Sequence, residues 1–228
     1  MGRLRIWDII LLALVALLVV VFILLGNWQV QRLGWKLDLI EQVEARAYGA
    51  PVDATPDDLA PYTRVRVGGT YQFDDTLRIK AVTELGPGFW IMTPLRGDAF
   101  TVWINRGFVP TGVDPDELRR DEGPQDVIGL VRSSVPEGTL LEKNDPEAGR
   151  WYSADVPVMS AQAGLDNIAP YFIDAERKVE DASWPRGGMT QLTFRNTHLA
   201  YALTWYAMAV LLAAAVAYII YTRRKSQA

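Results

Sequence analysis

His198 is the only histidine in this chain, and it lies where a polar segment meets a long apolar run. Residues 199–221 carry no formal charge, which is enough apolar length for a helix that crosses a bilayer. An imidazole can ligate a metal ion or carry a proton, and ionisable groups at the edge of a membrane span are candidates for function. The sequence has no cysteine, which excludes disulfides, zinc–thiolate sites and iron–sulfur clusters.

The residues after His198 favour a flat aromatic ligand. On a helix, Tyr201, Ala202 and Trp205 would share a face with His198, because they follow it by three, four and seven positions. That face would offer a nitrogen to haem iron, room beside it and a ring to pack on the macrocycle. Arg195 could pair with an anionic group such as a propionate. A histidine that only hydrogen-bonds at the interface, followed by helix-packing aromatics, is the alternative interpretation.

A second apolar run, from Ile9 to Leu25, lies near the N-terminus and can just cross a bilayer. We expect an uncleaved anchor, since the run is longer than the apolar part of a usual signal peptide and no small-residue cleavage site follows it. Basic residues flank the two spans on the outer sides: Arg3, Arg5, Arg223, Arg224 and Lys225. The positive-inside rule therefore predicts that both termini are cytoplasmic. Without an Arg- and Ser-rich presequence, the sequence favours a bacterial inner membrane over mitochondrial import.

The chain between the spans predicts a β-rich α+β domain. Apolar residues recur every three or four positions from 28 to 48, which is typical of an amphipathic helix. Residues 52–62 are rich in Pro and Asp and indicate a linker. Alternating apolar and polar residues, punctuated by Gly and Pro, then predict strands at 65–73, 77–81, 89–95, 100–109, 126–132 and 170–174, with a break at 86–88. Capping residues predict short helices at 114–118 and 155–163.

The expected organisation places this periplasmic domain between two transmembrane helices. Its parts are a cytoplasmic N-terminus (1–5), a first transmembrane helix (6–26), a periplasmic β-rich domain (27–198) that includes the amphipathic helix (28–48), a second transmembrane helix (199–221) and a cytoplasmic tail (222–228). Trp28, Arg32 and Trp35 share a face of the amphipathic helix. They form either an aromatic belt with a snorkelling arginine or part of a rim that holds a ligand.

Motifs of common enzyme classes are absent from the sequence. It has no G-x-x-x-x-G-K-[ST] phosphate loop and no G-x-G-x-x-G after a strand. A Ser-His-Asp triad would need His198 at the membrane edge, with no serine near it in sequence; a serine–lysine dyad stays open. We therefore expect a protein that is not an enzyme. Acidic residues outnumber basic ones between the spans, so we expect no binding to nucleic acid.

Several motifs occur in a fixed order along the chain. Residues 25–36 read LGNWQVQRLGWK, residues 103–110 read WINRGFVP and residues 196–206 read NTHLAYALTWY. Shorter matches are Val67, Gly69, Tyr71, Gly88, Phe89, Asn144, Trp151 and Tyr152. Together they resemble the Surfeit locus protein family, whose motifs are L-G-x-W-Q-x-x-R-x-x-W-K, V-N-R-G-W-V-P and N-N-H-L-x-Y-A-x-T-W-Y. The chain departs from these motifs at Phe108, in the usual Trp place, and at Thr197, in place of the second Asn.

The resemblance implies a membrane-anchored factor that binds haem a and helps insert it into the catalytic subunit of cytochrome c oxidase, with haem a synthase as a further partner. His198 matches the family's proposed ligand of the haem iron. The further candidates for cofactor binding are Arg195, Tyr201, Trp205, Trp28 and Arg32. Trp103, Arg106 and Gly107 match a motif that we expect to stabilise the fold, with Gly107 where a side chain would crowd the backbone. The alternative is a scaffold that stabilises the oxidase subunit without carrying haem.

Overall fold

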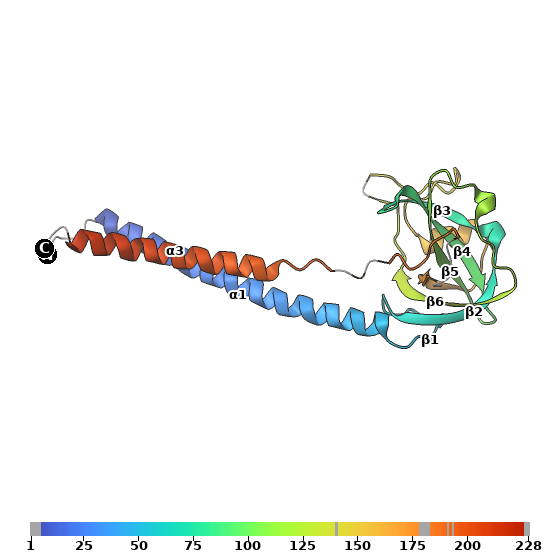
Figure 1. The fold of residues 1–228 in the computed structure, drawn as a ribbon, viewed down its shortest axis with the longest axis horizontal. Coiled ribbons are helices and arrows are strands. Elements are labelled where there is room, and N and C mark those ends of the chain that lie inside the picture. The colour runs from blue at the N-terminus through green and yellow to red at the C-terminus, as the bar shows by residue number, and fades with distance from the viewer. Residues whose placement is uncertain (1–5, 140, 178–182, 191, 193, 226–228) are drawn as a thin grey trace. The chain divides into compact units, whose positions relative to one another are not determined.

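The computed structural model describes residues 6–139, 141–177, 183–190, 192 and 194–225. The chain forms two compact units, one made of Met1–Gln42 with Thr193–Ala228 and the other of Val43–Leu192. Two long helices supply the first unit, and a β-sheet with one short α-helix supplies most of the second (Figure 1). The predicted class is confirmed: a β-rich domain occupies the middle of the sequence, with a long apolar helix before it and another after it.

Helix α1 runs without a break from Ile6 to Tyr48, and helix α3 runs from His198 to Lys225. The N-terminal apolar run and the amphipathic stripe after it therefore belong to one helix of 43 residues. Both helices are long and apolar enough to cross a membrane, by length and composition. Their leucines are largely exposed, for example Leu17 at 59% and Leu211 at 69%. Moving a leucine side chain fully from water into an apolar environment is favourable by about 1.5–3 kcal/mol. This surface therefore fits lipid.

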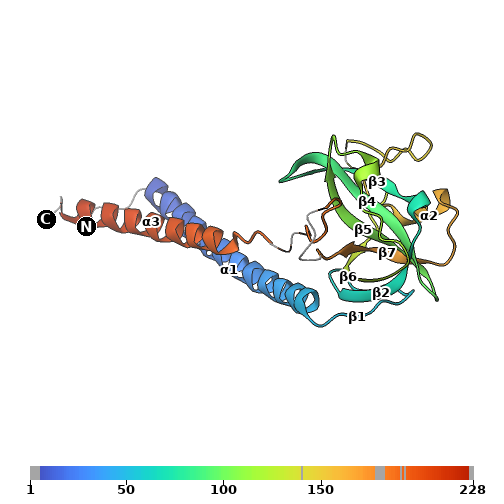
Figure 2. The same cartoon turned by 45° about the vertical axis from the view of Figure 1, so that its right-hand side comes forward.

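The β domain is built on a seven-stranded sheet. Its strands are β1 Val52–Asp53, β2 Arg64–Tyr71, β3 Leu77–Thr83, β4 Gly86–Arg96, β5 Thr101–Pro110, β6 Pro124–Ser133 and β7 Ile168–Ala175. The strand order is β1-β2-β6-β7-β5-β4-β3, and β2 pairs in addition with β4. This extra pairing, of Thr70 with Arg96 and of Tyr71 with Leu95, joins β2, β6, β7, β5 and β4 into a small barrel (Figure 2).

Most strand predictions are confirmed, and two expectations are wrong. The strands predicted at 89–95 and 100–109 form the β4–β5 hairpin. The expected linker 52–62 contains β1, which pairs in parallel with the start of β2. The expected break at 86–88 lies inside β4. Pro87 is tolerated there because it is the second residue of the strand, and its carbonyl still accepts from the Thr111 amide at 3.1 Å.

The two short helices form where capping residues predict them. Asp114 caps the 3₁₀ helix η2, Pro115–Glu117, with its side chain accepting from the amide of Asp116 at 3.0 Å. Asp155 caps α2, Val156–Gln162, in the same way. A further 3₁₀ turn, η1, spans Phe73–Asp75 and ends the alternating segment two residues earlier than predicted.

The strands bury a different set of side chains on each face. The barrel interior holds Val65, Val67, Leu95, Val102, Ile104, Val127, Val131, Ala169, Tyr171 and Ile173. A second cluster joins strand residues of the outer face, Ile79, Met92, Trp103 and Phe172, to Trp151, Ala154 and the α2 residues Val156 and Met159. Trp103 is fully buried there and donates its indole N–H to the Ser160 hydroxyl at 3.0 Å. A buried Trp whose N–H is satisfied stabilises the core and fixes where α2 lies.

The Asn-Arg-Gly motif of β5 stabilises the fold, as predicted. Asn105 donates to a carboxylate oxygen of Asp174 at 2.9 Å and accepts from the Gly107 amide at 3.1 Å. Gly107 has φ +130°, and a Cβ there would lie 2.1 Å from the carbonyl carbon of Arg186. That close approach allows Phe108 to pair with Arg186 through N–H···O bonds of 2.9 and 3.0 Å. The expectation that a side chain would crowd the backbone at Gly107 is confirmed.

Arg106 is a buried charge held between aromatic rings. Its side chain is 4% exposed, and its guanidinium carbon lies 5.1 Å from the Tyr71 ring centre and 4.9 Å from that of Phe73. It also donates to the Arg119 carbonyl and lies 4.0 Å from the Asp121 carboxylate. Burial lowers the pKa of Arg106 and raises that of Tyr71 to about 12, while each partner acts against the other's shift. The Arg106 contacts therefore serve the fold.

Replacing Gly107 with alanine should destabilise the β domain through both backbone conformation and crowding. We expect a loss of roughly 2–5 kcal/mol in the free energy of unfolding, from about 1–2 for the backbone and about 1–3 for overpacking. Urea unfolding of the full chain, followed by tryptophan fluorescence, measures it. Gly112→Ala is the matched control, because Gly112 also has a positive φ (+98°) but nothing within 4 Å of its Cβ position. Equal losses in the two variants would contradict the crowding.

Candidate functional site

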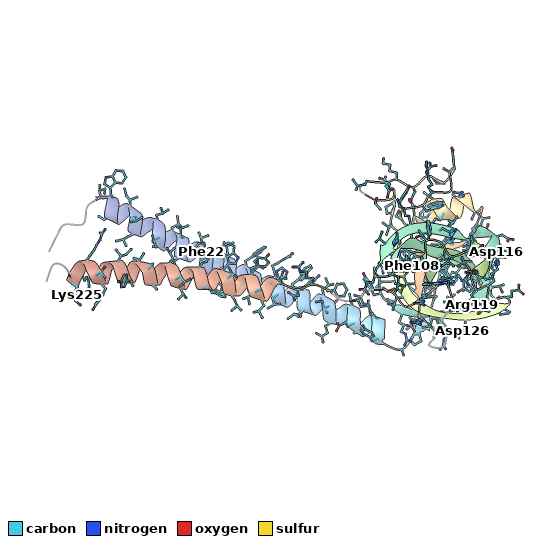
Figure 3. The ribbon with its side chains drawn as sticks, turned by 45° about the horizontal axis from the view of Figure 1, so that its top comes forward. Phe22, Phe108, Asp116, Arg119, Asp126 and Lys225 are labelled. Carbon is cyan, nitrogen blue, oxygen red and sulfur yellow. The ribbon has the colours of Figure 1, made fainter. Side chains whose placement is uncertain are left out.

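Helices α1 and α3 pack side by side in opposite directions (Figures 1 and 2). The Phe22 ring on α1 lies 5.7 Å from the Trp205 ring on α3, and Gln29 meets His198. Higher numbers on α1 thus face lower numbers on α3, which is an antiparallel pair. Figure 3 shows Phe22 where the two helices run together. The contacts fall on one side of each helix, and the opposite sides remain exposed.

Between these two contacts, a glycine brings the helices together. Gly26 is buried, and a Cβ there would lie 2.5 Å from the ring of Tyr206. The Tyr206 hydroxyl donates to the side-chain oxygen of Asn27 at 2.7 Å. Small residues that admit a partner, together with hydrogen bonds between helices, are the means by which apolar helices associate in lipid.

His198 is the first residue of α3 and is half-buried. Its backbone amide donates to the side-chain oxygen of Asn196 at 3.3 Å, which satisfies one N–H group at the start of the helix. Ring atom Nδ1 lies 2.8 Å from Oε1 of Gln29. Within the part of the chain that the structure describes, Nε2 makes no hydrogen bond. The imidazole is therefore oriented through one nitrogen and leaves the other available to a ligand.

The other predicted site residues do not gather around this ring. Trp205 packs on Phe22, and Arg32 stacks on Trp35 of the same helix at 4.7 Å. Trp28, Tyr201 and Arg195 are exposed. Among the described residues, no hydrogen bond or ring contact joins Trp28, Arg32, Tyr201 or Trp205 to His198.

His198, Tyr201, Ala202 and Trp205 lie on one helix at the predicted spacing, but α1 covers only part of the face that they share. Ala202 is 1% exposed, whereas Tyr201 is 55% exposed. Positions i+3 and i+4 lie on either side of the line through residue i, because a helix turns by about 100° per residue. Helix α1 covers the side of α3 that carries Ala202, at i+4, so Tyr201, at i+3, stays exposed.

Among the hollows of the β domain, two lie beside buried polar groups. The larger, about 840 Å³, is of the size that small ligands occupy, and Asn105, Arg132, Asp174 and Thr190 line it. These polar groups satisfy one another, since Asp174 accepts from the other three at 2.8 to 3.0 Å. The smaller, about 190 Å³, lies beside Arg106. Because the only histidine is on α3, neither hollow offers an imidazole. Within the described ranges, no three acidic or histidine side chains are placed to hold a metal ion.

Sequence reasoning did not single out Gln29, Asn27 or Phe22 as partners of α3. A signal for Gln29 existed, because Gly26, Gln29 and Leu33 follow at helical spacing along one face. A polar side chain in such a seam of a membrane helix indicates a hydrogen bond to a neighbouring helix. Its partner could not be known before the two helices were placed side by side.

The sequence of residues 16–210 matches the SURF1 family. The chain belongs to the SURF1 family. It is 32% identical to Surfeit locus protein 1 of Rattus norvegicus over 208 residues, 81% of this chain and 67% of the relative. The Homo sapiens protein of the same name gives 32% over 209 residues, 81% and 69%. A SURF1-like protein of Monosiga brevicollis gives 32% over 222 residues, 88% and 83%. The match to the SURF1 family includes both Gln29 and His198.

The packing of α1 on α3 predicts which engineered cysteines can be linked. Because the chain has no cysteine of its own, a Phe22→Cys, Trp205→Cys pair is the only reactive pair in that variant. We expect a short bismaleimide to join these positions within one chain, with the linked peptides identified by mass spectrometry. In the matched control, Ile23→Cys replaces Phe22→Cys; Ile23 is 42% exposed and points about 100° away around the helix. Linking should be several-fold slower there, and equal rates would refute the packing.

Proposed function

We propose that this protein is a membrane-anchored assembly factor that binds haem a through His198 and helps insert it into the catalytic subunit of cytochrome c oxidase. Members of the SURF1 family are known as cytochrome c oxidase assembly factors, and the chain's two apolar helices suit a membrane protein. The haem step is the part that we add. We further place the protein in a bacterial inner membrane, with both termini cytoplasmic and the β domain in the periplasm.

One observation carries the haem assignment. His198 is the only imidazole of the chain, it lies at the end of a candidate membrane span, and its Nε2 is unused among the described residues. A neutral imidazole nitrogen is a common protein ligand of haem iron, and Nε2 of His198 would supply it. The His198 ring is half-buried, and Tyr201, one turn further along α3, is exposed and offers an aromatic surface on which a porphyrin could pack.

The remaining candidate residues have supporting roles in this proposal. Arg195 is exposed three residues before His198 and can pair with a carboxylate at the aqueous edge. Tyr201 is free to contact the macrocycle, whereas Trp205 stabilises the helix pair through Phe22. Trp28 and Arg32 present an exposed aromatic and cationic surface on α1. Because the chain has one histidine, a second imidazole ligand would have to come from another molecule.

Replacing His198 with alanine should remove haem a from the purified protein. After co-expression with haem a synthase, we expect the Soret band to disappear from the spectrum of the variant, with affinity for added haem a lowered by more than about tenfold. The helix pair should persist, as circular dichroism can check, because Gly26, Tyr206 and Asn27 are unchanged. Leu211→Ala, at an exposed position further along α3, is the control and should keep its haem. Full haem content in His198→Ala would refute the assignment.

A scaffold that holds the oxidase subunit without haem is the second candidate function. The exposed apolar faces of α1 and α3 favour it, because helices of another membrane protein can pack on them. It predicts a colourless protein that still co-purifies with the oxidase subunit from cells replete in haem a. Near-stoichiometric haem in the purified wild-type protein would exclude it.

A further inference from the structure

Gln29 is the residue that the structure adds to the candidate site. We propose that Gln29 acts as a positioning residue for His198, holding the imidazole in the tautomer whose lone pair is on Nε2. This inference rests on the proposed function in one respect: we take the purpose of the tautomer to be the presentation of Nε2 to haem iron. The tautomer itself is a property of the protein alone and can be measured without haem.

The hydrogen bond decides which nitrogen carries the proton. Nδ1 of His198 lies 2.8 Å from Oε1 of Gln29, and an amide oxygen can only accept a hydrogen bond. A neutral imidazole has one N–H, so an amide oxygen at this position places the proton on Nδ1 and leaves the lone pair on Nε2. In ligating histidines, the nitrogen that does not bind the metal donates its N–H to such an acceptor, which fixes both the tautomer and the ring orientation.

The helix pair holds the amide in place. Gln29 is half-buried on α1, whereas His198 belongs to α3, so the bond exists only while the two helices keep their register. Gly26, one turn before Gln29, brings the Tyr206 ring against α1, and the Tyr206 hydroxyl is bound to Asn27. Half-burial also limits competition by water for the amide oxygen. Asn196 holds the other side of His198 through the backbone amide.

The reverse orientation of the Gln29 amide would have the opposite consequence for His198. If the amide were turned round, its NH₂ group would donate to Nδ1, the proton would be on Nε2, and that nitrogen could not ligate iron. The two arrangements therefore predict opposite tautomers of the same ring. This makes the tautomer of His198, rather than the presence of the contact, the quantity to measure.

The tautomer can be read from one residue. Since the chain has a single histidine, ¹⁵N-histidine labelling of the full-length protein in lipid nanodiscs, without haem, gives the signals of His198 alone. With the ring in its neutral form, we expect the proton on Nδ1. Gln29→Met keeps the length of the side chain but removes the acceptor, and should shift the population away from this tautomer. Gln29→Glu retains an acceptor oxygen and should preserve it.

Binding of haem a gives the second readout. We expect the Kd of Gln29→Met for haem a to rise by about 10- to 100-fold, as for other partners of metal-ligating histidines. The Kd of Gln29→Glu should not rise, because the carboxylate retains an acceptor oxygen and, being charged, strengthens the ligating imidazole. Gln31→Met is the matched control: Gln31 is exposed on the same helix, and its replacement should alter neither the tautomer nor the Kd.

The possible failures can be told apart. A proton on Nε2 in the wild-type protein, or an unchanged tautomer in Gln29→Met, would overturn the role of Gln29 whatever the haem data show. Haem binding that survives His198→Ala would instead overturn the proposed function and leave the tautomer result intact. A tautomer that changes in Gln29→Met without any change in the Kd for haem a would show that Gln29 sets the tautomer but that this does not matter for haem, and would overturn its role in presenting Nε2 to iron.

Discussion

Two apolar helices in lipid gain little from the hydrophobic effect when they meet, because lipid tails are as apolar as leucine. Their register must come from close packing and from hydrogen bonds. In this chain, Gly26 allows close packing because it admits the Tyr206 ring, while Asn27 and Gln29 form hydrogen bonds to α3. A slip of one residue would move α1 by about 1.5 Å and turn its contact face by about 100°. Both hydrogen bonds would then be lost, so the position of the His198 ring depends on this short stretch of α1.

The motifs shared with the SURF1 family divide into two groups by what their side chains do. In the β domain, Asn105 donates to a carboxylate, and Arg106 donates to a backbone carbonyl. Gly107 allows two chain segments to approach closely. Asn144 does the same in a loop, where its oxygen accepts from the amides of Tyr152 and Ser153 at 2.8 and 3.1 Å. Their hydrogen-bonding capacity is used within the protein. On the helix pair, by contrast, the His198 ring keeps a nitrogen unused among the described residues, and chemistry with an outside molecule is open to it.

Local patterns predicted much of this fold because local forces determine those parts. Alternation along β2, the turn at Gly97 and the Asp155 cap each involve residues close in sequence. The barrel closure, the pairing of β1 with β2 and the strand character of Pro87 arise from partners far along the chain or from strand position, which periodicity does not report.

The candidate site, too, could be predicted only where it depends on residues close in sequence. His198 stood out because one histidine at the end of an apolar run is rare by composition alone. Gln29, 169 positions away, gains its meaning only from the antiparallel packing. The predicted face of α3 was right in its spacing but could not say which side α1 would cover, so Tyr201 is exposed and Trp205 is packed.

The hydrogen-bond acceptor at Nδ1 of His198 affects how strongly this residue could hold haem iron, and therefore how easily the protein could release it. Hydrogen bonding from the distal N–H raises the basicity of a ligating imidazole, and a charged acceptor does so more strongly than a neutral one. A carboxylate at position 29 would therefore make His198 a stronger ligand, whereas the amide of Gln29 orients the ring with less effect on its basicity. Under the proposed function, an oriented ligand of moderate strength suits a factor that must give up its haem. Tyr201 and Arg195, three positions to either side of His198, are exposed, so under the same proposal an acceptor protein could approach this end of α3.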